Sequence, residues 1–157
     1  MNWIVVDVQS FKNSNSYIFK EFSYSNSDDA TVIMFEPPFE WSLLSKADKK
    51  TNRYLTYHYH GLHWYDGNIP YRYLSSYLEA ALRPNDSILL IKGAEKKHNL
   101  QKILPQANIV DLAEYGCPSL KKLSCAESCI NHNLDNAKCA KRNVLMLTDW
   151  CKVNNFL

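Results

Sequence analysis

Short apolar runs rich in β-branched residues predict that the chain opens with three strands. The first run covers Trp3 to Val8, and polar turns separate it from Tyr17 to Phe22 and from Ala30 to Phe35. Runs of this length and composition are typical of half-buried or buried strands. Pro37 and Pro38 end the third run, because proline cannot continue a strand ladder. We therefore expect an antiparallel meander of three strands.

The rest of the chain alternates between helical and strand patterns. The expected elements are a helix after Pro70 with apolar positions at 73, 74, 77, 78 and 81, a strand at 87–91, a helix ending before Pro105, a strand at 107–112, and helical segments at 119–123 and 140–151. Segment 41–64 is ambiguous, and 54–59 could be extended. This order predicts an α/β fold with a mixed sheet and helices on its faces.

Composition bounds the class of protein. A length of 157 residues fits one domain over 1–157, and 46% apolar residues suit an ordinary globular core. A net charge of +2 does not by itself identify a nucleic-acid binder. We expect no membrane segment, since no run of about 18 apolar residues occurs. Five cysteines in a chain without an apparent secretion signal favour an intracellular, cytoplasmic or nuclear protein.

The order of elements resembles the ribonuclease H-like fold of DEDDh 3′–5′ exonucleases, whose motif residues bind two metal ions. The family's first-strand motif, Asp-x-Glu, aligns with Asp7-Val8-Gln9. The aspartate of the second motif, which opens a helix after a middle strand, falls on Lys97. In the last motif, the histidine aligns with Lys138 and the aspartate with Asn143. The resemblance therefore implies the fold with most of the acidic residues replaced.

These replacements bear directly on activity. Two-metal phosphodiester hydrolysis needs several carboxylates to hold two divalent ions. Asp7 alone cannot do so, and Lys97 would place a cation where a metal should lie. We therefore expect a catalytically degenerate, exonuclease-like domain, a pseudoenzyme. In the alternative interpretation, Asp7 is only a capping residue at a strand end.

A cysteine and histidine cluster lies in the last third of the chain. Its members are Cys117, Cys125, Cys129, His132 and Cys139. Thiolates and imidazole suit tetrahedral zinc, so we expect a structural zinc ion held by Cys117, Cys129, His132 and Cys139, with Cys125 as a substitute. Cysteines are also frequent in ordinary cores, which leaves simple burial as the other explanation. A degenerate ribonuclease H-like core with a Cys/His zinc site is similar in arrangement to the Maelstrom domain of the small-RNA silencing pathway.

Aromatic and histidine residues gather in the middle of the chain. His58 and His60 would share one face of a strand and could bind a metal, although ordinary exposed or hydrogen-bonded histidines explain them as well. The aromatics of 54–73 could stack on bases, fill a core or form a partner surface. The sequence favours ordinary exposed or hydrogen-bonded histidines over a metal site, and aromatics that fill a core over base stacking.

Basic residues border the position of the degenerate motifs. They are Lys92, Lys96, Lys97, His98, Lys102, Lys138, Lys141 and Arg142. In the expected fold these side chains converge, so they could bind a nucleic-acid backbone through its phosphates. A solvated helix surface is the alternative. The sequence favours a domain that binds nucleic acid or scaffolds a nucleic-acid-processing complex, over an active nuclease on single-stranded RNA or DNA or a protein-interaction domain.

Overall fold

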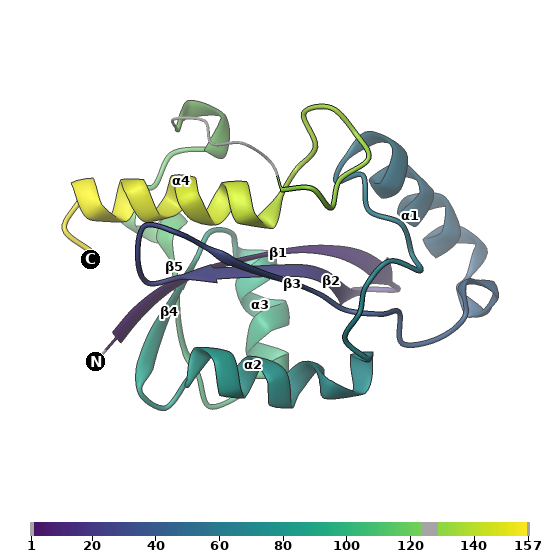
Figure 1. Cartoon of the computed structure of the whole chain (residues 1–157), viewed down its shortest axis with the longest axis horizontal. Helices are drawn as coiled ribbons and strands as arrows, with labels where there is room; N and C mark the ends of the chain where they lie inside the picture. Colours follow the sequence, from purple (N-terminus) through teal and green to yellow (C-terminus); the bar gives the residue numbers. More distant parts are fainter. Residues whose placement is uncertain (1, 124–128, 157) are drawn as a thin grey trace.

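The protein is built around one mixed sheet of five strands (Figure 1). A computed structural model describes residues 2–123 and 129–156. The strand order is β3-β2-β1-β4-β5, and helices lie on both faces of the sheet. The expected α/β class and the mixed sheet are therefore confirmed.

The three predicted opening strands form the expected meander. β1 covers Asn2–Asn13, β2 covers Ser16–Ser25 and β3 covers Thr31–Met34. β2 runs antiparallel to both β1 and β3. Both strands are longer than the apolar runs that predicted them, since β1 continues to the hairpin tip at Asn13 and β2 continues past Phe22 to Ser25, opposite Val5.

Two later strands extend the sheet on its other side. β4, Ser87–Ile91, lies parallel to β1, and β5, Asn108–Asp111, lies parallel to β4. Helix α3, Ala94–Ile103, connects them, as parallel neighbours require a crossover. Helix α2, Leu74–Leu82, precedes β4 and follows a short 3₁₀ turn at Tyr71–Tyr73. These elements agree with the sequence-based expectations.

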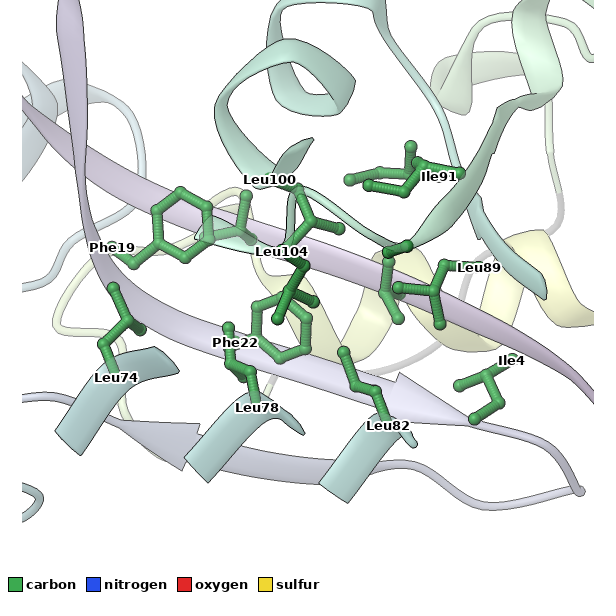
Figure 2. Close-up of a cluster of buried hydrophobic side chains, with 14 of the residues drawn as sticks. Ile4, Phe19, Phe22, Leu74, Leu78, Leu82, Leu89, Ile91, Leu100 and Leu104 are labelled. Carbon is green, nitrogen blue, oxygen red and sulfur yellow. The ribbon is translucent and has the colours of Figure 1, made fainter. Parts of the chain in front are cut away.

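One face of the sheet is covered by α2 and α3. Figure 2 shows three leucines of α2, Leu74, Leu78 and Leu82, pointing toward the sheet, with Leu100 of α3 and Leu104, which follows that helix, beside them. Burying each leucine side chain stabilises the fold by about 1.5–3 kcal/mol. Ile4 and Val6 of β1 face this layer, whereas Val5 faces the opposite one. Because both faces of the sheet are covered, the apolar run has no polar interruption before position 7.

The other face is covered by α4, Ala140–Val153, which runs along the sheet in Figure 1. Val144 and Leu147 of α4 pack against Val5 and Leu90 of the sheet. β1 also places Asp7 and Gln9 in the buried part of the chain, with Asp7 reaching α4. Polar side chains are therefore buried beneath the start of α4.

Segment 46–58 forms helix α1, Lys46–His58, so the suggestion of an extended segment at 54–59 was wrong. Ser45 caps the helix by accepting a hydrogen bond from Asp48 N at 3.1 Å. Only polar residues of the helix are buried, namely Asp48 and Asn52. An apolar stripe, the usual sign of a helix, is therefore missing from its inner face.

Polar contacts with the β1–β2 hairpin hold α1 in place. Asn52 accepts a hydrogen bond from Lys12 N at 2.8 Å and donates to Lys12 O at 2.9 Å. Asp48 accepts from Ser14 N at 2.9 Å. Figure 1 shows α1 at the end of the sheet, away from the layer formed by α4.

The remaining ordered segments are short. The helical segment expected at 119–123 is a single 3₁₀ turn, Leu120–Lys122, and further 3₁₀ turns lie at Trp41–Leu43 and Leu112–Tyr115. Among residues 2–123 and 129–156, no helix combines the length and apolar character that crossing a membrane requires.

Candidate metal centre

Strand β2 carries two buried charged residues in the middle of an apolar run, and the second of them is Glu21. Its side chain is fully buried. Oε1 accepts a hydrogen bond from Ala140 N, at the first residue of α4, at 2.8 Å. Oε2 accepts from Asn131 Nδ2 at 3.0 Å. The carboxylate thus joins the sheet to the chain that enters α4.

Three sulfur and nitrogen ligands surround Oε2 of Glu21. Sγ of Cys129 lies 3.1 Å from Oε2, and Nε2 of His132 lies 2.9 Å from it. Sγ of Cys139 lies 3.6 Å from Sγ of Cys129. One ligand atom from each of the four residues lies within 4.8 Å of the others. Residues separated by up to 118 positions therefore meet at one point.

Local structure aims each of these side chains. Cys139 caps α4, and its sulfur lies 3.5 Å from Arg142 N and 3.4 Å from Cys129 N, both of which donate to it. The Nδ1 of His132 lies against the carbonyl oxygen of His60. A ring nitrogen that donates to a carbonyl fixes the tautomer and leaves the other nitrogen free to bind a metal.

Among the described residues, the second ring nitrogen of His132 has one polar neighbour, Glu21 Oε2 at 2.9 Å. Nε2 is buried and directed at the group, yet its contact with Glu21 lacks hydrogen-bond geometry. An unsatisfied buried nitrogen of this kind is costly unless a further ligand binds it. The group of Glu21, Cys129, His132 and Cys139 could therefore hold a metal ion.

Charge within the group is unevenly distributed. Burial raises the pKa of Glu21, but its contacts with His132, Ala140 N and Asn131 together outweigh burial and leave that pKa below its usual value. Burial similarly opposes protonation of His132, whereas its contacts with Cys139 and Glu21 raise its pKa to about 10. The hydrogen bond from Cys129 is the main cause that lowers the pKa of Cys139 to about 4. Without a metal, a proton on His132 balances part of the negative charge.

The structure brings together three of the four ligands proposed from sequence and adds a carboxylate. Cys117 is not a member of the group: it packs with Val5, Leu90 and Cys151 under α4. Cys125, the suggested substitute, lies outside the described residues. Glu21 was not predicted as a ligand, because the expected zinc ligands were the cysteines and the histidine that lie close together in the last third of the chain.

Asp7 lies on β1, one strand away from Glu21, and has a different environment. Lys96 Nζ lies 2.6 Å from Asp7 Oδ1, and Asn143 Nδ2 donates to Oδ2 at 2.9 Å. Asp7 is 1% exposed. Burial raises its pKa, although the ammonium of Lys96 and the amide of Asn143 act in the opposite direction. Two donors therefore occupy both oxygens of this carboxylate.

The other motif positions lie around this pair. Gln9 pairs with Glu21 across the ladder, and its Nε2 is buried without a hydrogen-bond partner among the described residues. Lys96 makes the ion pair with Asp7. Lys97, which aligns with the aspartate of the second motif, is the next residue of α3 and is half-buried. Asp7 and Asn143, from the first and last motif, do meet.

The basic residues named from sequence are divided between two places. Lys141 lines a cavity of about 1080 Å³ along β3. Cys129 and Asn131 line the same cavity. Lys96 lines a cavity of about 180 Å³ beside Gln9. Of the remaining six, Lys92, Lys97, Lys138 and Arg142 are half-buried, and His98 and Lys102 are exposed. These two cavities do not form one basic cleft.

The histidines of 58–63 have separate roles. His60 is fully buried, where its Nε2 lies 3.1 Å from Ser10 O and its Nδ1 accepts from Leu62 N at 3.0 Å. His58 is exposed on α1. These two histidines therefore do not face a common site, and neither belongs to the metal-binding group found among the described residues.

Lys20, the other buried charge of β2, is a further residue that the sequence search missed. Its ammonium donates to the carbonyl oxygens of Phe35, Trp64 and Asp66 at 2.9, 2.7 and 2.6 Å. Burial lowers the pKa of Lys20 to about 8. Lys20 ties β2 to segment 64–66, so its role is explained by the fold.

Comparison with known proteins adds no relative. No family model matches the chain, and neither the curated proteins nor the solved structures gave a significant match. Function must therefore be argued from the site itself.

Proposed function

We propose that this chain is a zinc-stabilised, ribonuclease H-like domain that has lost exonuclease chemistry and binds nucleic acid. The observation that carries the proposal is the pairing of Asp7 with Lys96 and Asn143, next to a separate group suited to a metal. A protein ammonium and an amide occupy the carboxylate that would otherwise hold a catalytic ion.

The donor set of the metal group supports zinc. Two sulfurs, an imidazole nitrogen and a carboxylate oxygen are ligands that zinc binds. Zinc bonds of about 2.0–2.3 Å place tetrahedral ligands about 3.3–3.8 Å apart. The separations of 2.9–3.6 Å between neighbouring atoms of the group are close to that range. Four protein ligands leave no open position, so a bound zinc ion would be structural.

The ribonuclease H-like assignment has two supports. The antiparallel meander followed by two parallel strands, with helices on both faces, is the arrangement that the resemblance implies. In addition, Asp7 from the first motif and Asn143 from the last lie within hydrogen-bond distance. The first and the last motif contribute to one site in the exonucleases, and the residues at those positions, Asp7 and Asn143, also lie together here.

The chemistry of this site argues against two-metal hydrolysis. Two ions need several carboxylates, and Lys96 brings a positive charge to 2.6 Å from Asp7. Among the described residues, the sole group of three or more possible metal ligands is the one around Glu21. A divalent ion at Asp7 would have to displace Lys96 and overcome its repulsion.

Nucleic acid is the partner that basic and aromatic side chains on this fold favour. Lysine and arginine contact phosphates, and Lys141 lines the cavity that Cys129 of the metal group also lines. The active-nuclease alternative lacks the carboxylates that it needs.

The experiment combines metal analysis with binding and cleavage. Purified protein washed with a chelator is analysed for metal, then incubated with labelled single-stranded RNA and DNA in low salt with Mg²⁺ or Mn²⁺. We expect tightly held zinc and salt-sensitive binding without cleavage. Metal-dependent degradation that Asp7→Ala abolishes would contradict the loss of exonuclease chemistry, and absence of binding would contradict the nucleic-acid partner.

A further inference from the structure

Helix α1 has the reverse of the usual amphipathic pattern. Its outward side carries Lys46, Lys50, Arg53 and Tyr57, which follow one another at i, i+4, i+7 and i+11 and therefore lie on one face. Tyr54 borders this stripe. The tyrosines are 58% exposed at Tyr54 and 61% exposed at Tyr57. We call these five residues the α1 stripe.

The buried residues on the inner side of the same helix are polar, and Leu55 beside them is partly buried against an apolar cluster that includes Phe11 and Trp64. Asn52 is 0% exposed and Asp48 is 8% exposed, and both are satisfied by backbone groups of the β1–β2 hairpin. Folding thus buries an amide and a carboxylate while leaving two phenol rings in water. Stability alone does not explain this arrangement, since large exposed aromatic side chains are characteristic of binding surfaces.

The charge on the stripe defines the partner. Three of its five residues are cations, and Lys49 adds a half-buried fourth on the same helix. Asp48, the helix's acidic residue, is directed inward to Ser14 N. Glu40, in the segment that precedes α1, accepts a hydrogen bond from the hydroxyl of Tyr65. The outward face of α1 is therefore positively charged.

We propose that the α1 stripe binds single-stranded nucleic acid, a proposal that rests on the nucleic-acid-binding function above. Lys46 and Lys50 contact phosphates, and the rings of Tyr54 and Tyr57 stack on bases. From position 46 to 57 the helix rises about 16 Å, the length of about five nucleotides at 3.4 Å each. Arg53, which lies over the Trp41 ring at 5.6 Å, borders the stacking positions.

Single strands fit this surface better than duplexes do. Stacking on an exposed ring requires an unpaired base, and aromatic side chains next to lysines are typical of single-strand binding. The stripe belongs to α1, which lies at the end of the sheet in Figure 1, whereas Lys96 and Lys97 belong to α3. It is thus a second surface, distinct from the basic residues around the former catalytic position.

The test measures binding of short labelled oligouridylate and oligothymidylate by fluorescence anisotropy, from about 50 to about 200 mM salt. Tyr54→Ala with Tyr57→Ala should weaken binding at least roughly tenfold, because each stacked base contributes. Tyr54→Phe with Tyr57→Phe should keep binding near wild type, since both rings remain. The RNA and DNA arms show whether the strand's sugar matters.

Removal of charge gives an independent readout. Lys46→Gln with Lys50→Gln should lower the slope of log affinity against log salt by about 1.4, at about 0.7 for each lost phosphate contact. Lys121→Gln with Lys122→Gln removes two exposed charges elsewhere and should leave the slope unchanged. All substituted side chains are exposed, so thermal melts should match the wild type.

The outcomes separate this inference from the proposed function. Loss of binding in both α1 variants supports the stripe. Wild-type affinity in the α1 variants, with loss in Lys97→Gln and Lys141→Gln, overturns the stripe and keeps the nucleic-acid function. Equal affinity for duplex competitors overturns single-strand preference. A wild-type protein that binds neither oligonucleotide overturns both proposals and favours a protein partner for the exposed tyrosines.

Discussion

Two carboxylates are buried on neighbouring strands of the sheet, and they are neutralised in different ways. Asp7 on β1 has an ammonium and an amide from the protein itself, Lys96 and Asn143. Glu21 on β2 has backbone and amide donors, but its other neighbours are Cys129, Cys139 and His132, which can all be metal ligands. Both oxygens of Asp7 are thus paired within the protein, whereas the group around Glu21 could hold a metal ion.

The difference shows two ways in which one fold can compensate the charge of a buried carboxylate. A buried carboxylate is stable only when positive charge or hydrogen bonds compensate for desolvation. At Asp7 a lysine of the same chain, Lys96, supplies that positive charge, so a metal is unnecessary. At Glu21 the sequence supplies more electron-pair donors, so a metal has a place to bind.

The largest expected effect comes from removing a ligand of the metal group. Cys139→Ser should lose the metal and lower stability by about 4 kcal/mol, since it leaves a buried charged group without its partner. For a chain of this size, that corresponds to a fall in melting temperature of about 10 °C. Metal content and calorimetry of the purified variant test both parts.

Cys117→Ser is the matched control, because Cys117 is a buried cysteine in an apolar cluster. It should keep the metal and cost less stability than Cys139→Ser. Loss of the metal in Cys117→Ser, with retention in Cys139→Ser, would show that the ligand set proposed from the cysteine spacing was right and that the group around Glu21 is not the site.

The next effect tests the Asp7 site. Lys96→Met should destabilise the protein by about 3 kcal/mol near pH 7, because Asp7 then remains buried and charged without its cation. Lys97→Met, one residue along α3, should have little effect. Denaturant unfolding of both variants compares them directly, and equal effects would contradict the assignment of the ion pair to Lys96.

A smaller effect comes from His60, whose backbone carbonyl receives Nδ1 of His132. Burial lowers the pKa of the His60 side chain to about 4 from 6.5. The unfolded chain therefore binds a proton that the folded chain does not, and stability falls as pH drops through this window. Between about pH 7 and pH 5 the loss is about 2 kcal/mol.

Unfolding of metal-free protein across this pH range measures the effect without acid release of the metal. His60→Gln should reduce the pH dependence between pH 7 and pH 5, whereas substitution of the exposed His63 should not. An unchanged slope in His60→Gln would mean that His60 is not the titrating group.

The smallest effect compares isosteric changes at the two carboxylates. Asp7→Asn keeps one acceptor oxygen for Lys96 or Asn143 and turns an amide donor toward the other, so it should lower stability by about 1–2 kcal/mol and leave metal affinity unchanged. Glu21→Gln removes a charged ligand and should weaken metal binding at least roughly tenfold. Competition with a coloured chelator measures the metal affinity of both variants, and similar affinities would remove the distinction between the sites.

The sequence predicted the elements that follow an apolar pattern. The strands of the meander, β4 and β5, and the leucine face of α2 were all visible as runs or periodic positions. Helix α1 was not, because its inner residues are Asp48 and Asn52. Hydrogen bonds to a hairpin tip replace apolar contacts there, and these depend on the tertiary structure.

The candidate site was predicted in part for a similar reason. The density of cysteine and histidine identified Cys129, His132 and Cys139, which are close in sequence. Glu21 lies more than a hundred residues earlier, and only folding brings it to them. A charged pair in the middle of the apolar run of β2 was the available signal, since a buried carboxylate needs a partner.

Native mass spectrometry of the purified chain tests the central claim most directly, because it counts bound ions without unfolding the protein. The account predicts one zinc ion per chain in the wild type and in Asp7→Asn, and none in Cys139→Ser. A wild-type chain without metal, or an ion that Asp7→Asn removes and Cys139→Ser retains, would contradict it.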